Sequence, residues 1–223
     1  MSRRINWEAI YNMAELKQEL EKALEELRKE AKQRKFDQSV DFIINLQKFD
    51  VKKSNLNVFV SVPHKIKEKR IAGFLEATNN VVDTIIPEDF KKYTDKKVLK
   101  NLVNRYDFFV AQASIMPKVA TTFGRVLGPT GKMPSPQLGI VANADEKIIN
   151  ELKNKINHSI KIKLKEPSIK VSIGKQSMKN EDLAENAITV YNAVLKEMPR
   201  DKENFKNVEI KFTMTKPKKI KLR

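Results

Sequence analysis

The chain has 223 residues, 40% of them hydrophobic, which is enough for one large domain or two small ones. The lack of cysteine excludes disulfides, thiolate nucleophiles and zinc–thiolate sites, two histidines are too few for a histidine-rich metal centre, and we expect neither a membrane span nor a signal peptide. With 44 Lys and Arg against 28 Asp and Glu, the formal net charge is +16, which is typical of proteins that bind polyanions such as nucleic acid.

An amphipathic helix is predicted first, over residues 13–34. Its apolar residues recur at steps of three and four, with Lys and Glu between them: Leu16, Leu20, Ala23, Leu24, Leu27 and Ala31. Arg34 and Lys35 are expected to close this helix, with Phe36 beside them. The apolar stripe either packs on a sheet, which is the commoner arrangement, or forms a face that binds a partner.

Two β-rich runs follow, over residues 39–46 and 57–62, and they are predicted to be neighbouring strands. Pro63 and the charged residues after it mark a domain boundary. Strand and helix candidates then alternate, a pattern typical of a parallel α/β unit. The expected strands cover residues 71–74, 81–86 and 107–111, and the expected helices cover residues 95–104 and 116–127.

The pattern changes again in the last third of the chain. A helix with Asn143 and Asp145 as caps is followed by Ile160, Ile162 and Leu164, which alternate with Lys161, Lys163 and Lys165. Apolar alternation resumes after Pro167, so we expect an antiparallel hairpin with one basic face, then a helix over residues 180–198 and a strand over residues 208–214. The simplest topology is an α+β domain built from both chain ends, with an α/β domain inserted between them.

The densest motif is GRVLGPTGKMPSPQLG, from Gly124 to Gly139, which is expected to form a loop with positive φ angles and fixed turns. Its GPTGK core is similar to a phosphate-binding loop. However, Val126 stands where such a loop needs its first glycine, and Met133 stands where it needs a magnesium-binding Ser or Thr. Nor does the chain contain a GxGxxG dinucleotide motif. We therefore expect no cofactor, no metal and, because no nucleophile–base pair stands out, no catalytic residue.

Basic side chains concentrate near the chain's end. Residues 157–223 carry 16 basic and 8 acidic side chains, and this net +8 is half of the total excess. A basic C-terminal run, together with Lys35 beside Phe36, suits RNA, where phosphates position the protein and unpaired bases stack. Two alternatives remain: the lysines keep a strand edge soluble, and Phe36 fills the core at the helix end.

Four segments together resemble the ribosomal protein L1 family, in an archaeal-like form. They are RKFDQSVDF at 34–42, the glycine–proline segment at 124–139, IGKQSMKNEDLAENA at 173–187 and TMT at 213–215. The resemblance implies two domains joined by a hinge. Residues 1–65 and 158–223 would form a two-layer α+β domain, an antiparallel sheet with helices, and residues 66–157 an inserted Rossmann-like, three-layer α/β domain that binds no nucleotide.

The resemblance also implies which residues contact RNA. The family's positions correspond to Lys35, Phe36, Ser39, Asp41, Asn207, Thr213, Met214 and Thr215, with Lys165 and Lys170 on a bordering segment. Ser39 stands where Thr is commoner, Asn207 stands where Ser is usual, and Thr215 and Lys216 replace a Gly-Pro pair. We expect the Thr213–Met214 strand to pack flat against ribose and base edges, while lysines bind phosphates.

A member of this family is a structural protein of the large-subunit stalk and not an enzyme. It would bind large-subunit rRNA near the tRNA exit site, assist release of deacylated tRNA and repress translation by binding its own mRNA. The implied partners are therefore rRNA, that mRNA, transiently tRNA and other ribosomal components. The protein would act on the cytoplasmic ribosome, make no membrane contact and be a monomer when free. Two alternatives are an α/β enzyme with an anionic substrate under residues 124–139, and an RNA chaperone without a fixed site.

Overall fold

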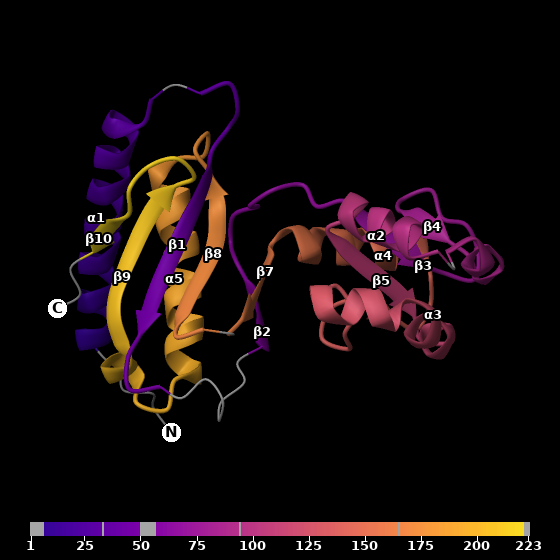
Figure 1. Ribbon diagram of the computed structural model, residues 1–223. Helices are drawn as coiled ribbons and strands as arrows, with labels where there is room; N and C mark the ends of the chain where they lie inside the picture. Colours follow the sequence, from indigo (N-terminus) through magenta and orange to yellow (C-terminus); the bar gives the residue numbers. More distant parts are fainter. Residues whose placement is uncertain (1–6, 33, 50–56, 94, 165, 221–223) are drawn as a thin grey trace. The chain divides into compact units, whose positions relative to one another are not determined.

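The computed structural model describes residues 7–32, 34–49, 57–93, 95–164 and 166–220 (Figure 1). It is an α/β fold with several sheets, and the chain divides into two compact units. Unit 1 comprises Met1–Lys67 and His158–Arg223, and unit 2 comprises Glu68–Asn157. None of the helices in the described ranges combines the length and the apolar character needed to span a bilayer.

Unit 1 contains a four-stranded antiparallel sheet in the order β10-β9-β1-β8. Its strands are β1 (Ser39–Leu46), β8 (Ser168–Lys175), β9 (Phe205–Phe212) and β10 (Lys218–Ile220). Alternate residues along β1 are buried, as the period of a half-buried strand requires. Helices α1 (Trp7–Glu30) and α5 (Asn180–Glu197) pack on the buried face, and the short 3-10 helix η2 (Asp201–Asn204) precedes β9 (Figure 1).

The apolar stripe of α1 packs on the sheet, which confirms the commoner of the two expected arrangements. Leu20, Leu24 and Leu27 are completely buried in the same core as Phe42. Helix α1 ends at Glu30, so the prediction that Arg34 and Lys35 close it is wrong. Tertiary contacts override the helical pattern there, because residues after the helix bind the loop between β8 and α5: the Gln38 carbonyl accepts a hydrogen bond from Gln176 N at 2.8 Å.

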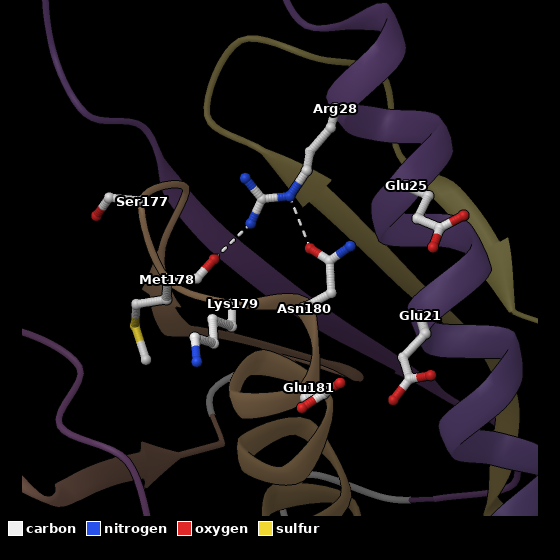
Figure 2. A pocket seen from close by; sticks show the side chains of 8 residues that line it. All are labelled: Glu21, Glu25, Arg28, Ser177, Met178, Lys179, Asn180 and Glu181. Atoms are coloured by element: carbon white, nitrogen blue, oxygen red, sulfur yellow. Dashed lines mark hydrogen bonds between the residues drawn. The ribbon is translucent and has the colours of Figure 1, made fainter.

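Arg28 fastens α1 to the same loop (Figure 2). Its guanidinium donates to Asn180 Oδ1 at 2.6 Å, to the Gln176 carbonyl at 2.7 Å and to the Met178 carbonyl at 2.5 Å. Gly174, near the end of β8, packs closely on α5, because a Cβ there would lie 2.5 Å from Leu183 Cδ2. A side chain at this position would require the buried Leu183 side chain to move.

Strands β2 (Asn57–Ser61) and β7 (Ser159–Lys163) form a separate two-stranded antiparallel ribbon. Two predictions are therefore wrong: β1 and β2 are not neighbours, and residues 160–173 do not form a hairpin. Pairing with β2 lets β7 bury Ile162 together with Val60 in the core of unit 1, beside α5. Local alternation predicts the strands, but the gain from burying these side chains decides which strands pair.

Unit 2 contains a parallel sheet in the order β4-β3-β5-β6, as the alternating pattern predicts. Its strands are β3 (Ile71–Phe74), β4 (Asp83–Ile85), β5 (Phe108–Gln112) and β6 (Ile140–Val141), and its helices are η1 (Pro87–Tyr93), α2 (Lys96–Arg105), α3 (Met116–Thr130) and α4 (Glu146–Asn157). Phe74 of β3 packs against Phe109 of β5 and Phe123 of α3, in a cluster that also contains Leu102 of α2. Val110 packs with Ile149 of α4 in a second cluster, so helices cover both faces of this sheet.

The glycine–proline segment is only partly a loop. Helix α3 continues through Gly124 and Gly128, so the loop prediction is wrong there, because burial of Phe123 and Leu127 outweighs the low helix propensity of glycine. The predicted positive φ angles occur at Gly131, with φ of 72°, and at Gly139, with φ of 137°. Gly131 ends the helix in a left-handed conformation, in which Gly131 N donates to the Gly128 carbonyl at 3.0 Å.

Lys132, which a phosphate-binding loop would direct at its ligand, has a structural role. Its ammonium donates to the carbonyls of Val103 at 2.7 Å and Tyr106 at 2.8 Å, at the C-terminus of α2. Carbonyls of a helix's last turn have no partner within the helix, and a cation is favourable there. The structure thus gives a structural explanation for the lysine of the GPTGK motif.

Candidate nucleic-acid interface

The sheet of unit 1 has an outer face, opposite the one on which α1 and α5 pack (Figure 1). The side chains of this outer face are half-buried or exposed, and nearly all are polar. They are Ser39, Asp41, Ile43 and Asn45 on β1, Ser168, Lys170 and Ser172 on β8, Asn207, Glu209 and Lys211 on β9, and Lys219 on β10. Such a face offers donors and acceptors to ribose and phosphate groups.

At one end of the sheet, the start of β1 is hydrogen-bonded to the residues after β9. Ser39 N donates to Thr213 Oγ1 at 3.1 Å, and Thr213 N donates to the Ser39 carbonyl at 3.1 Å. The Gln38 side-chain oxygen accepts from Met214 N at 3.1 Å. These bonds hold the two segments side by side. We call residues 34–39 and 213–216, together with Lys32, the sheet-end surface.

Thr213, Met214 and Thr215 lie in a turn, and the prediction that β9 extends to Met214 is wrong. Phe212 N donates to Thr215 Oγ1 at 2.9 Å, and Thr215 N donates to the Phe212 carbonyl at 3.1 Å. These bonds close a tight turn, so the backbone cannot continue along the strand. An RNA would therefore meet a projecting turn at this position and not a flat strand.

Phe36 and Met214 are the large apolar side chains of the sheet-end surface, and both are exposed. Their exposed fractions are 52% and 57%. The interpretation of Phe36 as a core residue is therefore wrong, and Lys35 beside it is exposed as well. Exposed aromatic and thioether groups next to cations can stack on unpaired bases while the cations bind phosphates.

Asp41 lies on the outer face between Lys211 of β9 and Ser172 of β8. Burial raises the pKa of the Asp41 carboxyl, and the Lys211 ammonium partly offsets this rise. A partly desolvated carboxylate is a strong acceptor for a hydroxyl, and a ribose 2′-hydroxyl is such a donor. Lys211, which sequence analysis missed, supplies a cation in the same row of side chains.

Asn207 is on the outer face but at the other end of β9 from Thr213. It pairs with Asn45, whereas Phe212, next to Thr213, pairs with Val40, so roughly 20 Å of strand separates Asn207 from the turn. Asn207 Nδ2 donates to Glu209 Oε1 at 3.1 Å, and Asn207 Oδ1 is buried without a hydrogen-bond partner in the described part of the chain. A single nucleotide cannot contact both positions.

Lys170 lies between these two ends. It faces Ile43 on β1, and its ammonium is 3.9 Å from the Glu166 carboxylate, with both side chains largely exposed. An exposed pair at that distance leaves the lysine available to a phosphate. Lys165, the other predicted residue of this segment, lies outside the described residues.

The cations around the sheet-end surface fall into two classes. Lys218 binds Glu30 at 2.6 Å and Glu26 at 3.0 Å, and these hydrogen bonds raise the pKa of its ammonium. Lys32, Arg34 and Lys216 form no ion pair with any described carboxylate. Sequence analysis did not separate the two classes, since lysines at 216 and 218 look alike in a basic run.

The described residues contain no group of three or more His, Asp or Glu side chains placed to hold a metal ion. The residues gathered at the sheet-end surface are cations, amides, hydroxyls and exposed apolar groups. This arrangement suits binding to a phosphate backbone with exposed bases.

Comparison with known proteins identifies similar chains. A model of the family described as "Ribosomal protein L1p/L10e family" matches residues 27–216. The large ribosomal subunit protein uL1 of Thermofilum pendens is 38% identical over 216 residues, which cover 89% of this chain and 92% of the relative. The protein of the same name from Nanoarchaeum equitans is 33% identical over 196 residues, covering 83% of this chain and 92% of the relative. That from Thermococcus kodakarensis is 35% identical, with 91% and 96% covered.

Proposed function

The chain belongs to the ribosomal protein L1p/L10e family, and from this premise we propose that it is a structural, non-catalytic component of the large ribosomal subunit that binds rRNA through unit 1. The relatives' shared name, large ribosomal subunit protein uL1, supports this assignment. The site of action is then the cytoplasmic ribosome. Its partners are large-subunit rRNA and neighbouring ribosomal components.

One observation carries the proposal. The sheet-end surface places exposed Phe36 and Met214 among Lys32, Arg34 and Lys216, cations without ion pairs to described carboxylates. A solvated face kept soluble by charge does not need exposed aromatic and thioether groups, whereas an RNA site uses both.

Finer parts of the proposal follow from the family. We propose that the rRNA site lies near the tRNA exit site, that the protein contacts tRNA transiently and assists release of the deacylated form, and that it represses translation of its own mRNA by binding a similar RNA structure. The outer face from Ser39 to Asn207 would then contact successive nucleotides of one folded RNA. Lys35, Asp41, Lys165 and Lys170 would contact its phosphates and riboses.

The test is equilibrium binding of the full chain to large-subunit rRNA across a salt series, with small-subunit rRNA as control. We expect tighter binding to the large-subunit RNA, and an affinity that falls steeply with salt, by about 0.9 log units per log unit of salt for each duplex phosphate neutralised. Equal affinity for both RNAs would contradict the proposal and favour an RNA chaperone without a fixed site.

We also propose that unit 1 is a domain that folds and binds RNA without unit 2. Ser61 pairs with Ser159, and Val62 N donates to the His158 carbonyl at 2.7 Å. The point where the chain leaves unit 1 therefore lies beside the point where it returns. Joining residues 1–65 to residues 158–223 by a short Gly-Ser linker is expected to retain most of the rRNA affinity. Loss of rRNA binding by this folded chain would place the site elsewhere.

A further inference from the structure

A small pocket opens at the sheet-end surface. Two of its lining residues, Met214 and Thr215, are positions that the family resemblance supplies, whereas Gln38 is not. Its volume is about 260 Å³. It is lined by Glu30, Lys32, Arg34, Gln38, Met214, Thr215 and Lys216. Pockets for drug-sized ligands begin at about 300 Å³, so this one suits a group the size of one planar ring system.

The wall of the pocket contains a polar side chain with a free donor. Gln38 is only 1% exposed, and its Oε1 accepts from Met214 N at 3.1 Å. No described residue accepts a hydrogen bond from its Nε2, which retains some contact with solvent. This N–H is therefore available to a ligand that brings an acceptor into the pocket.

The pocket has more cations than carboxylates available to a ligand. Lys32, Arg34 and Lys216 have no carboxylate partner among the described residues, although Lys218, two residues after Lys216, has two. Glu30 is occupied by Lys218 at 2.6 Å. Cations therefore remain available on the pocket's rim, where a negatively charged group would compensate them.

We propose that this pocket holds one unstacked nucleobase of the bound RNA. A ring nitrogen or carbonyl of the base accepts from Gln38 Nε2, the Met214 thioether lies against the ring, and the flanking phosphates bind Lys32, Arg34 and Lys216. This inference rests on the proposed function, since it names the part of the RNA that the sheet-end surface selects. It assigns to Gln38 both the positioning of Met214 and a direct contact to the base.

Mononucleotides test the pocket without rRNA. The full chain is titrated with AMP, GMP, CMP and UMP, each followed by the NMR signals of the Gln38 side-chain amide, with ribose 5-phosphate as the control that has no base. We expect at least one mononucleotide to shift the Gln38 signals saturably, at millimolar concentration, and ribose 5-phosphate to leave them unchanged. Equal shifts from ribose 5-phosphate and all four mononucleotides would overturn the inference, because they would show a phosphate site only.

Two substitutions separate the roles of Gln38. Gln38→Glu keeps an acceptor for Met214 N and, once ionised, removes the donor, whereas Gln38→Met removes both. Both are expected to weaken binding of the preferred mononucleotide, by roughly two- to tenfold for the lost hydrogen bond, but only Gln38→Met should shift the backbone signals of residues 213–215. Gln18→Glu is the matched control, because it adds the same charge on the exposed side of α1, where the Gln18 side chain forms no hydrogen bond with a described residue. A Gln38→Glu chain that binds mononucleotides like Gln18→Glu would overturn the direct contact.

Binding to large-subunit rRNA distinguishes a failure of the pocket inference from a failure of the proposed function. If the wild-type chain prefers large-subunit rRNA and Gln38→Glu binds it as tightly as Gln18→Glu does, the pocket inference fails and the proposed function stands. If the wild-type chain shows no preference, the proposed function fails, and the mononucleotide titration still decides whether the pocket takes a base. The pocket inference predicts a preference for large-subunit rRNA that Gln38→Glu reduces severalfold.

Discussion

The glycine–proline segment of unit 2 has a distinctive sequence, but its lysine is bonded within the protein. The sheet-end surface of unit 1 has an undistinguished sequence, but its cations are available to a ligand. The segment from Gly124 to Gly139 is the most distinctive stretch of the chain, and its Lys132 is bonded to two carbonyls of α2. The sheet-end surface carries little beyond scattered lysines, one phenylalanine and one methionine, yet Lys32, Arg34 and Lys216 have no described carboxylate partner.

This difference shows what a conspicuous motif can mean. Glycines in the first region satisfy backbone demands: a left-handed helix end at Gly131 and a close approach at Gly139, where a Cβ would lie 3.2 Å from the Phe109 carbonyl. The second region keeps exposed apolar groups and cations without a partner among the described carboxylates, and these contribute little to folding. Substitutions in the two regions should therefore affect different measurements.

The largest expected effect is on RNA binding, from Met214→Asp. The new carboxylate replaces an exposed apolar contact and lies near the RNA phosphates, so we expect the affinity for large-subunit rRNA to fall by about 100-fold, which corresponds to roughly 3 kcal/mol. Met214 is 57% exposed, so the free energy of unfolding should change by less than about 0.5 kcal/mol. Filter binding and urea unfolding check the two halves of this prediction.

Lys132→Met should produce the converse result. It leaves two carbonyls of the last turn of α2 without their charged donor, and we expect a loss of roughly 2–3 kcal/mol in the stability of unit 2. Thermal unfolding measures this loss. Affinity for large-subunit rRNA at a temperature where the variant is folded should stay within about twofold of wild type; a large decrease would mean that the motif binds RNA directly.

Two lysines of the C-terminal run form a sharper test. Lys216→Ala should flatten the slope of log affinity against log salt by about one unit, because one phosphate contact is lost. Lys218→Ala should leave the slope unchanged, because Lys218 is already paired with Glu26 and Glu30. Equal slopes for the two variants would show that ion pairing within the protein does not decide which cations bind RNA.

Asp41→Asn gives the smallest effect. Burial raises the folded-state pKa of Asp41 above its unfolded value near 3.9, so its carboxyl favours folding when protonated, and this contribution is lost as pH rises through the folded-state pKa. We therefore expect Asp41→Asn to be more stable than wild type by about 0.5 kcal/mol at pH 7, after allowance for solvent screening, and equally stable at pH 3. Urea unfolding at both pH values checks the sign.

Local patterns predicted most elements of the fold. The 3.6-residue period of α5 and the two-residue period of β1 are strong signals, and both elements end within a residue or two of the expected positions. Strand pairing was predicted less well. Nothing local distinguishes β7 paired with β2 from β7 paired with β8, because the choice depends on where Val60 and Ile162 are buried in three dimensions.

The candidate site was also predicted only in part from the sequence. Phe36, Ser39, Thr213 and Met214 were identified by resemblance, and the structure brings the two segments together. Gln38 was missed because a single glutamine has no periodicity and no motif. Its importance comes from burial and from its bond to Met214 N, which joins residues 176 positions apart.

Hydrogen–deuterium exchange of the full chain, with and without large-subunit rRNA, tests the central claim most directly. The account predicts slower exchange of backbone amides over residues 34–39 and 211–216 in the complex, and unchanged exchange over residues 124–139. Protection of residues 124–139 with no change at the sheet-end surface would contradict it.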